Sequence, residues 1–139
     1  MSHAVTSAFS VRSYEVDSYA HLNNGVYLSW FEQGRLDYLQ SLGFSYDGLK
    51  ERGAGIVVRR VEVDFLSPLH TGDTTQMTTR IKKMGGTSVH FVQTLVTQDE
   101  NPTPVAKATT VMVFANDQGA CPIPDDFRQA VGPDNGGCD

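Results

Sequence analysis

The sequence has few cysteines, no long hydrophobic run and no excess of basic residues, and each absence excludes a class of protein. Its two cysteines, Cys121 and Cys138, lie near the C-terminal end and match no zinc-binding or redox spacing. They predict no disulfide framework, no metal site and a reducing compartment, which favours a cytoplasmic location. No apolar run approaches the ~18 residues of a membrane-spanning helix. The N-terminus lacks the basic and apolar blocks of a signal peptide, so we expect no membrane association.

The net charge and the length of the chain exclude further classes of protein. Eleven Lys and Arg stand against sixteen Asp and Glu, which gives a formal net charge of −5. A reader of duplex DNA neutralises phosphates with basic side chains, so we expect no nucleic-acid partner. A chain of 139 residues fits one domain. We expect a single domain over residues 1–139, with its core at about 9–127 and a flexible tail at 128–139.

The N-terminal part predicts a strand, a polar turn and a long helix. Residues 9–16 alternate apolar and polar side chains, with a phase slip between Val11 and Tyr14 that a bulge could absorb. The helix is expected over 25–42, after an Asn cap and before Gly43. Apolar side chains cover most of its circumference, which predicts a buried helix. Gly34 in its middle suggests close approach of another backbone. A second, shorter helix is expected at about 45–52.

The rest of the chain predicts an antiparallel sheet. From Ile56 the period is two, with one face formed by Val57, Arg59, Val61, Val63 and Phe65 and the other by Arg60, Glu62 and Asp64. Further strands are expected at 75–84, 87–97 and 105–115, and Gly85-Gly86 marks a hairpin. One sheet with a helix on one face is an α+β architecture. A helix that is apolar nearly all round requires the sheet to curl about it, or a partner subunit to complete its cover.

The densest group of reactive side chains spans residues 14–27. It places the carboxylate of Asp17 at the end of a strand, followed by a polar turn and the start of the buried helix. Unpaired N–H groups at a helix N-terminus can hold an oxyanion, and a nearby carboxylate can act as general base or nucleophile. Each residue taken alone also has an ordinary structural role. Asp17 could satisfy turn amides, His21 could be a packed histidine, and Asn23 and Asn24 could be caps.

The run Val16-Asp17-x-x-x-His21-Leu22-Asn23-Asn24-x-x-Tyr27 resembles the signature of hotdog-fold thioesterases of the 4-hydroxybenzoyl-CoA thioesterase type. Two later runs look like that family's second strand with its following turn and its final strand: Val61-x-Val63-x-Phe65-Leu66-x-Pro68-Leu69-x-x-Gly72-Asp73, and Val105 to Val113. The segment Glu32-Gln33-Gly34-Arg35 is also similar to acyl-ACP thioesterases of this clade. The resemblance covers roughly residues 9–127.

The resemblance implies a five-stranded antiparallel sheet wrapped around a long central helix. It also implies a homodimer built by pairing sheet edges, often doubled to a homotetramer, a dimer of dimers. The catalytic carboxylate falls on Asp17 and the oxyanion donor on the backbone N–H of Asn24. His21, Asn23 and Tyr27 match positions that shape the site. Glu32, within the helix, competes with Asp17 for the catalytic role, or else pairs with Arg35 one turn later.

The implied substrate is an acyl-CoA or acyl-ACP thioester, hydrolysed to free acid and thiol without a separate cofactor. Coenzyme A carries phosphates, and phosphates need cations. The candidates are basic side chains on two strands: Arg59, Arg60, Arg80, Lys82 and Lys83. Lysines on strand edges also prevent aggregation, which is the alternative explanation. By resemblance, Gly85, Gly86 and Thr87 would offer backbone contacts to the pantetheine arm.

Two other functions compete with hydrolysis. A 3-hydroxyacyl-thioester dehydratase or hydratase would need an acid–base pair, for which His21 and Glu32 are conceivable. A non-catalytic acyl-thioester binding module would be expected to lack the carboxylate, whereas Asp17 is present. We therefore expect a thioester hydrolase.

Overall fold

The computed structural model describes residues 3–132, which form one antiparallel sheet and three α-helices. The expected 45–52 helix is present, capped by Ser45, whose side chain accepts a hydrogen bond from the amide of Gly48. The strands expected in the second half are present within a residue or so of their predicted bounds. In chain order the elements are β1 (Ala4–Ser10), a 3-10 turn η1 (Ser13–Glu15), α1 (Asn24–Ser41), α2 (Tyr46–Glu51), β2 (Gly55–Phe65), β3 (Thr74–Met84), β4 (Ser88–Thr97), β5 (Pro104–Asn116), β6 (Gly119–Ala120) and α3 (Asp125–Val131).

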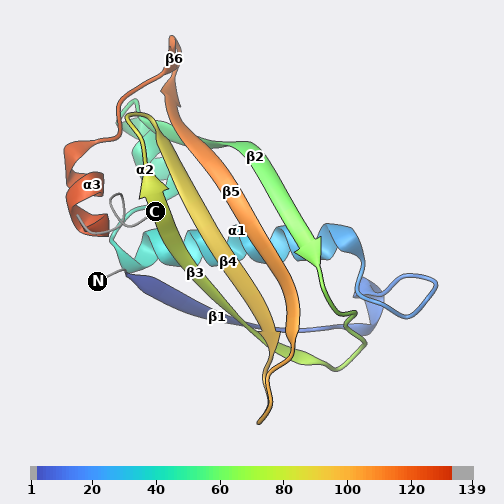
Figure 1. Ribbon diagram of the computed structural model, residues 1–139. Coiled ribbons are helices and arrows are strands. Elements are labelled where there is room, and N and C mark those ends of the chain that lie inside the picture. Colours follow the sequence, from blue (N-terminus) through green and yellow to red (C-terminus); the bar gives the residue numbers. More distant parts are fainter. Residues whose placement is uncertain (1–2, 133–139) are drawn as a thin grey trace.

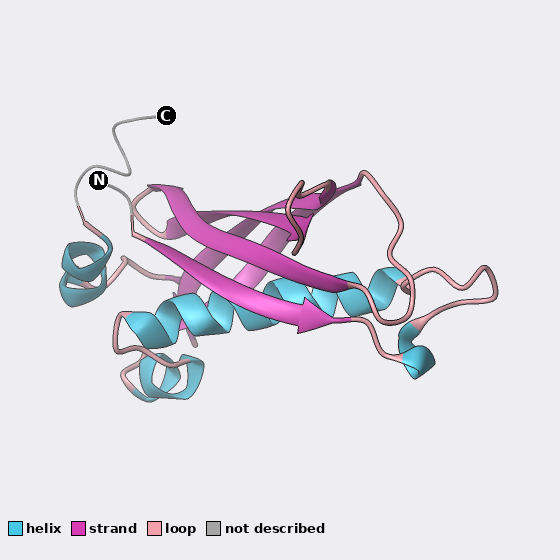
Figure 2. Ribbon diagram, turned by 90° about the horizontal axis from the view of Figure 1, so that it is seen from below, coloured by secondary structure: helices cyan, strands magenta, loops and turns pink. Residues whose placement is uncertain are grey.

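The sheet has six strands rather than the five expected. Five follow the order β1-β3-β4-β5-β2, and the two-residue β6 pairs with the end of β5. All pairings are antiparallel, and β1 and β2 form the two edges. The helix α1 crosses behind the strands in Figure 1, and Figure 2 shows it along one face of the curled sheet. The fold is therefore an α+β layer of helix on sheet.

The helix α1 packs against β1, β3 and β4, while α2 packs on β2. Its buried face comprises Tyr27, Trp30, Phe31, Gly34, Arg35, Tyr38 and Leu39. The cover is less complete than the apolar composition predicted, because Leu28 is 49% exposed and Glu32 and Gln33 are also exposed. One side of α1 thus faces solvent in the single chain.

Gly34 lies where side chains of the sheet press against α1. A Cβ at this position would be 2.6 Å from Met77 Sδ, 2.7 Å from Gln93 Nε2 and 2.8 Å from Thr79 Oγ1. The close approach predicted for Gly34 is therefore to side chains of β3 and β4, and not to another backbone. Gln93 fills this space because its amide donates to the carbonyl oxygen of Phe31 on α1 at 2.8 Å.

The predicted range of the first strand, residues 9–16, was wrong. The strand runs over residues 4–10, and the expected continuation to residue 16 is the 3-10 turn η1. The backbone amide of Arg12 donates to the Glu15 carboxylate at 2.9 Å, and the amide of Glu15 donates to the Arg12 carbonyl at 3.0 Å. The phase slip after Val11 therefore marks the end of the strand, because local hydrogen bonds replace the sheet ladder.

The strand β2 contains a bulge that changes which side chains share a face. Its pairing with β5 shifts between Val58 and Arg60, so Arg59 has no partner opposite. Directly opposite residues of an antiparallel pair point to the same side. Val61 pairs with Thr110, which is buried on the helix side, whereas Val57 pairs with Val113 on the opposite side. The single face predicted for Val57 to Phe65 is therefore wrong at its first residues.

The C-terminal helix α3 was not anticipated. Phe127 is fully buried and stacks edge-on against Phe44 and Phe114, with ring centroids 5.1 and 5.2 Å apart. Val131 is also buried, so the segment expected to be a tail from residue 128 continues as a helix to residue 131. The remainder of that expected tail, residues 133–139 with Cys138, lies outside the described residues, and Cys121 is a buried free thiol.

Candidate active site

A tight hairpin carries Asp17 between the 3-10 turn and α1. The amide of Asp17 donates to the carbonyl of His21 at 2.8 Å, and Val16 and Leu22 form an isolated bridge. Ala20 closes the turn with φ of 62°, a left-handed conformation uncommon outside glycine. The hairpin is anchored to the sheet because the amide of Leu22 donates to the carbonyl of Leu69 at 2.8 Å.

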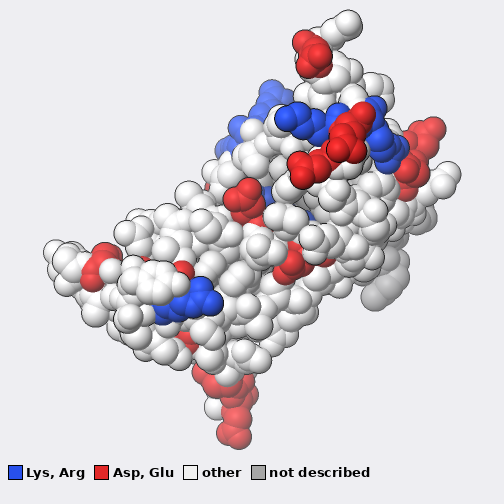
Figure 3. All heavy atoms as spheres, turned by 180° about the vertical axis from the view of Figure 1, so that it is seen from behind, with Lys and Arg blue, Asp and Glu red and all other residues white. Residues whose placement is uncertain are grey.

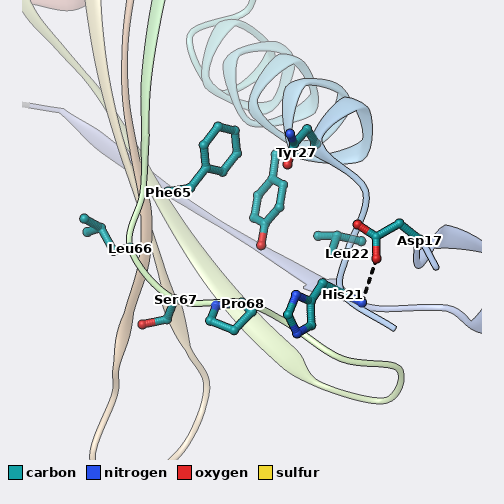
Figure 4. A pocket seen from close by; sticks show the side chains of 9 residues that line it. Asp17, His21, Leu22, Tyr27, Phe65, Leu66, Ser67 and Pro68 are labelled. Carbon is teal, nitrogen blue, oxygen red and sulfur yellow. Dashed lines mark hydrogen bonds between the residues drawn. The ribbon is translucent and has the colours of Figure 1, made fainter. Parts of the chain in front are cut away.

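The Asp17 carboxylate is fixed on one side. Its Oδ1 accepts hydrogen bonds from the amides of Tyr19 at 2.9 Å and His21 at 3.2 Å; the second bond is the dashed line in Figure 4. No hydrogen bond to Oδ2 is present within residues 3–132. Asp17 therefore satisfies turn amides, as its structural role predicted, and also keeps one oxygen for another partner.

The helix α1 begins beside this carboxylate. Asn23 is its N-cap, and the Asn23 side chain accepts a hydrogen bond from the amide of Gly25 at 2.9 Å. The carbonyl oxygen of Asn23 accepts a hydrogen bond from the amide of Val26. In the described part of the chain, the amide of Asn24 has no hydrogen-bond partner. Asn23 thus orders the first turn and leaves the donor of Asn24, the first helical residue, available.

Asp17 and Asn24 line one cavity of about 350 Å³. Figure 4 shows the side chains around it, which come from the hairpin, from the first turn of α1 and from the end of β2. The other lining residues are His21, Leu22, Tyr27, Phe65, Leu66, Ser67 and Pro68. The sequence singled out Asp17, His21, Asn24 and Tyr27, and the fold brings these four together. It missed the wall formed by residues 65–68, which only the path of β2 places opposite α1.

Tyr27 forms the inner wall of the cavity. It is only 3% exposed, and burial raises the pKa of its phenol above the ordinary value. Its ring contacts Phe65 edge-to-face, with centroids 5.0 Å apart. Figure 4 shows the hydroxyl directed toward His21 and Pro68. The phenol therefore stays protonated and can donate a hydrogen bond to a group in the cavity.

His21 is supported by a second histidine that the sequence did not indicate. The rings of His21 and His70 meet edge-to-face at 5.1 Å. His70 is held by Asp73, whose carboxylate accepts the His70 amide at 2.8 Å and lies 3.7 Å from Nδ1. The only signal for this contact was the His-Thr-Gly-Asp turn after β2.

The structure separates Glu32 from this cavity. Glu32 is exposed on α1 and is not among the lining residues. It also forms no ion pair with Arg35 within residues 3–132. Arg35 is instead buried, and its guanidinium donates to Gln93 at 3.2 Å and Thr110 at 3.3 Å. Burial lowers the pKa of Arg35 from its ordinary value. The catalytic role considered for Glu32 therefore lacks support in the geometry of one chain. The interaction with Arg35 is electrostatic and not a direct ion pair, since the charge of Glu32 raises the pKa of Arg35 against the larger effect of burial.

The candidate phosphate-binding residues lie away from the cavity. The cavity adjoins the end of β2 and the region before β3, whereas Arg80, Lys82 and Lys83 are near the far end of β3. An eleven-residue strand is about 35 Å long at about 3.3 Å per residue. Arg59 and Arg60 lie in the middle of β2, and Arg60 pairs with Glu62 at 3.0 Å. One chain does not bring these cations to Asp17.

The hairpin between β3 and β4 is engaged by the C-terminal segment. The carbonyl of Gly85 accepts a hydrogen bond from Arg128 at 2.8 Å, and that of Gly86 accepts the amide of Ile123 at 3.0 Å. The carbonyl oxygen of Thr87 accepts a hydrogen bond from the amide of Phe114 on β5 at 2.9 Å. These three carbonyls therefore hold the fold together, which reduces what they offer to a pantetheine arm.

His, Cys, Asp and Glu side chains within residues 3–132 form no group of three that could hold a metal ion. Over the same range, none of the helices combines the length and hydrophobicity that crossing a bilayer requires.

Comparison with known proteins places the chain in a family. The family model of the thioesterase-like superfamily matches residues 11–131. An acyl-acyl carrier protein thioesterase of the Arabidopsis thaliana chloroplast is 28% identical over 108 residues, which is 78% of this chain and 56% of that protein. The chain thus spans about half the length of this relative.

Solved structures give the same result. A predicted thioesterase from Bacillus stearothermophilus is 31% identical, with a TM-score of 0.79 over 93% of this chain and 94% of its own. A mutant 4-hydroxybenzoyl-CoA thioesterase in complex with 4-hydroxybenzoyl-CoA, 17% identical, has a TM-score of 0.85 over 93% and 99% of the two chains. The resemblance stated from the Asp17 motif is confirmed, and the chain belongs to the thioesterase-like superfamily, with an α+β hotdog fold.

Proposed function

We propose that this chain hydrolyses an acyl thioester to a free acid and a thiol. The observation that carries the proposal is the shared cavity of Asp17 and Asn24. It joins a carboxylate with one free oxygen to an unpartnered amide at the start of a helix. The family of the chain and the thioesterase relatives support the same reaction.

The two groups supply the two requirements of thioester cleavage. The amide of Asn24, at the positive end of the α1 dipole, donates to the carbonyl oxygen and stabilises the negative charge that develops there. Asp17 either removes a proton from the attacking water or attacks the carbonyl carbon itself. In the first route the oxygen of water bonds to the carbonyl carbon, the C–S bond breaks and the free acid forms. In the second route the C–S bond breaks as an Asp17–acyl anhydride forms, and water then hydrolyses this anhydride to the free acid and the Asp17 carboxylate. In both routes the sulfur leaves as a thiolate and takes up the proton that water released. Tyr27, whose pKa is raised by burial, remains a hydrogen-bond donor during the reaction.

We propose acyl-CoA or acyl-ACP as the substrate, with no separate cofactor. One relative is named an acyl-acyl carrier protein thioesterase, and one structural neighbour holds 4-hydroxybenzoyl-CoA. The acyl group would enter the cavity against the aromatic pair of Tyr27 and Phe65, which contact each other at 5.0 Å. His21 and Asn23 would act by shaping the hairpin and the first turn of α1.

We also propose that the working unit is a homodimer formed along β2, and that two such dimers associate into a homotetramer. The β2 edge is unpaired in the single chain, and several of its aliphatic side chains are exposed: Val57, Val58, Val61 and Phe65. A long exposed apolar edge strand is a surface on which another strand pairs. The second subunit would also cover Leu28 and the open side of α1, which would make that helix central.

Substitution of Asp17 tests the proposal. In a thiol-release assay over acyl-CoA and acyl-ACP substrates, Asp17→Asn should lower turnover by on the order of 10²-fold or more, the range for loss of a general acid–base group. Glu32→Gln is the matched control, because Glu32 is exposed and outside the cavity. Wild-type-like turnover of Asp17→Asn would contradict the role of Asp17. A comparable loss in Glu32→Gln alone would move the role to Glu32.

A dehydratase or hydratase is less compatible with the site. That reaction needs an acid–base pair, and Glu32 does not share the cavity of His21. A non-catalytic binding module would be favoured if the protein bound acyl thioesters tightly and released no thiol from any of them.

A further inference from the structure

We propose that His21 supplies the proton that the departing sulfur of the substrate takes up, and that His70, held by Asp73, is a positioning residue for the His21 ring. This inference rests on the proposed function, because it concerns one step of thioester hydrolysis. His21 lines the Asp17 cavity, and His70 lies in the separate turn between β2 and β3.

The leaving group is the reason for a second proton-transfer group in the cavity. The sulfur departs as an alkyl thiolate, which is more basic than a carboxylate, so an acid that protonates it in the transition state speeds cleavage of the C–S bond. Among the described residues, no Lys or Arg lines the cavity. On the face shown in Figure 3, the Lys and Arg side chains gather mainly toward one end. The negative charge on sulfur therefore needs a proton, because no fixed cation of this cavity neutralises it.

The chemistry of the other lining side chains leaves His21 as the donor. Asp17 Oδ1 accepts the amides of Tyr19 and His21 at 2.9 and 3.2 Å, so Oδ2 alone is left to activate water or to attack the carbonyl carbon. Burial raises the pKa of the Tyr27 phenol above an ordinary value that already exceeds the pKa of a thiol. The Ser67 hydroxyl, an aliphatic alcohol, is a weaker acid still. An imidazolium is a stronger acid than a thiol, so His21 gives up its proton to the sulfur favourably.

The protons balance over one turnover. In the general-base route, Asp17 takes a proton from water, the water oxygen bonds to the carbonyl carbon, and the imidazolium of His21 protonates the sulfur as the C–S bond breaks. Transfer of the Asp17 proton to the neutral imidazole then restores both groups. In the nucleophilic route, His21 protonates the sulfur as the Asp17–acyl anhydride forms. The neutral imidazole next takes the proton that water releases when it hydrolyses this anhydride.

His70 orients the ring of His21 from the neighbouring turn. The two rings meet edge-to-face, with centroids 5.1 Å apart and an angle of 80° between their planes. The two backbone segments are joined beside them, because the amide of Leu22 donates to the carbonyl of Leu69 at 2.8 Å. Since each histidine is adjacent in sequence to one partner of this hydrogen bond, both side chains leave the backbone at a fixed separation.

Asp73 holds the turn that carries His70. Its Oδ2 accepts the amide of His70 at 2.8 Å and lies 3.7 Å from Nδ1 of the same residue. The turn is tied to the segment after β1, because the amide of Val11 donates to the Asp73 carbonyl and the Val11 carbonyl accepts the amide of Gly72, both at 2.9 Å. The His70 side chain is 55% exposed, so these contacts, and not burial, restrain it against His21.

The dependence of the rate on the leaving group tests His21. The acyl group that is hydrolysed best in the thiol-release assay is placed on N-acetylcysteamine, an alkyl thiol, and on thiophenol, a stronger acid whose thiolate leaves without a proton. His21→Gln should lower kcat for the alkyl thioester by roughly 10²-fold, with KM little changed, and for the phenyl thioester by less than about threefold. Imidazole added to the buffer should restore part of the activity of His21→Ala on the alkyl thioester, which a role in folding alone would not allow.

A double-mutant cycle tests whether His70 acts through His21. His70→Ala should lower kcat for the alkyl thioester by about tenfold and have no further effect in the His21→Gln protein, because the two residues act as one unit. His70→Phe keeps a flat ring against His21 and should retain most of the activity. Thr71→Ala is the matched control, since Thr71 is exposed in the same turn. Losses that multiply in the double variant, or equal losses of His70→Ala with both leaving groups, would overturn the positioning role.

Wild-type activity on the two thioesters separates this inference from the proposed function. If wild type hydrolyses neither thioester, the proposed function fails and the proton transfer from His21 fails with it. If wild type is active and His21→Gln loses the same activity with both leaving groups, or none with the alkyl thiol, thioester hydrolysis stands and the role of His21 is overturned. Asp17 would then protonate the sulfur itself.

Discussion

The substitution Gly34→Ala gives the sharpest test of how α1 packs on the sheet, because two physical effects predict opposite signs. Alanine is the better helix former by about 1 kcal/mol, so propensity alone predicts a more stable protein. The new methyl group, however, would lie 2.6–2.8 Å from atoms of Met77, Thr79 and Gln93. Real carbon contacts are not this short, so these side chains must move.

The magnitude follows from what has to move. Inserting a methyl group into a filled core costs about 1–3 kcal/mol. Displacing Gln93 also weakens its bonds to the Phe31 carbonyl and Thr79, at 2.8 and 3.0 Å, and removes an acceptor of the buried Arg35. A buried polar group left unsatisfied costs about 1–3 kcal/mol. After subtraction of the propensity gain, we expect a net loss on the order of 1–5 kcal/mol.

Urea unfolding followed by circular dichroism measures this loss, with both proteins at the same concentration because the proposed dimer makes stability depend on it. Ser29→Ala is the matched control, since Ser29 is exposed on the same helix. Its free energy of unfolding should change by less than about 0.5 kcal/mol. A Gly34→Ala protein as stable as wild type, or more stable, would refute the packing argument and show that the sheet side chains yield without cost.

Three further results are expected. Gln93→Leu should lower the free energy of unfolding by about 2–3 kcal/mol in the same urea assay, because Arg35 and the Phe31 carbonyl lose a buried partner, whereas the exposed Gln76→Leu should be nearly neutral. The pKa of His90 is lowered by burial and then by Lys83 and Lys82. Folding thus favours neutral His90, so stability should be complete above its unfolded pKa of about 6.5 and fall as the pH drops below it. His90→Gln should lose less stability between pH 7 and 5, and an identical acid dependence would contradict this assignment. The pKa of Tyr27 is raised by burial, so Tyr27 should stabilise the fold below about pH 10 and do so less as the pH rises further; a Tyr27→Phe protein with unchanged alkaline loss would argue against it.

Local patterns predicted the elements that their own side chains define. The alternation in β3 and β4 places Met77, Ile81, Phe91 and Leu95 in the core, as expected from period two. The Asn cap and Gly43 likewise bracket α1. The strand end after Val11 was missed because the Arg12–Glu15 hydrogen bonds that end it are not visible as a hydrophobic period. The helix α3 was missed because the Pro, Gly and Asp residues around it indicated a loop, and the single apolar Phe127 did not indicate a helix.

The site was predictable only where it is local in sequence. Asp17, His21, Asn24 and Tyr27 lie within one hairpin and one helical turn, so their spacing already determines that they share a cavity. Phe65 faces them only because β2 pairs with β5 and ends beside α1, which depends on strand order. The bulge at Arg59 is a further non-local feature, since a count of alternate residues assigns Val57 to the wrong face.

The basic residues expected to bind phosphate are of a suitable chemical type, but one chain does not place them near Asp17. A phosphate-bearing substrate needs basic groups, and in one chain the expected cations Arg80, Lys82 and Lys83 lie near the far end of β3, remote from Asp17. A single subunit would leave a thioester's anionic arm beside Glu15, Asp64 and Asp73, where like charges repel it. The proposed homodimer along β2 would therefore have to bring basic side chains of the second subunit to the cavity. On this reasoning the net charge of −5 is no obstacle to an anionic substrate, because phosphate binding depends on a few local cations and not on the overall charge.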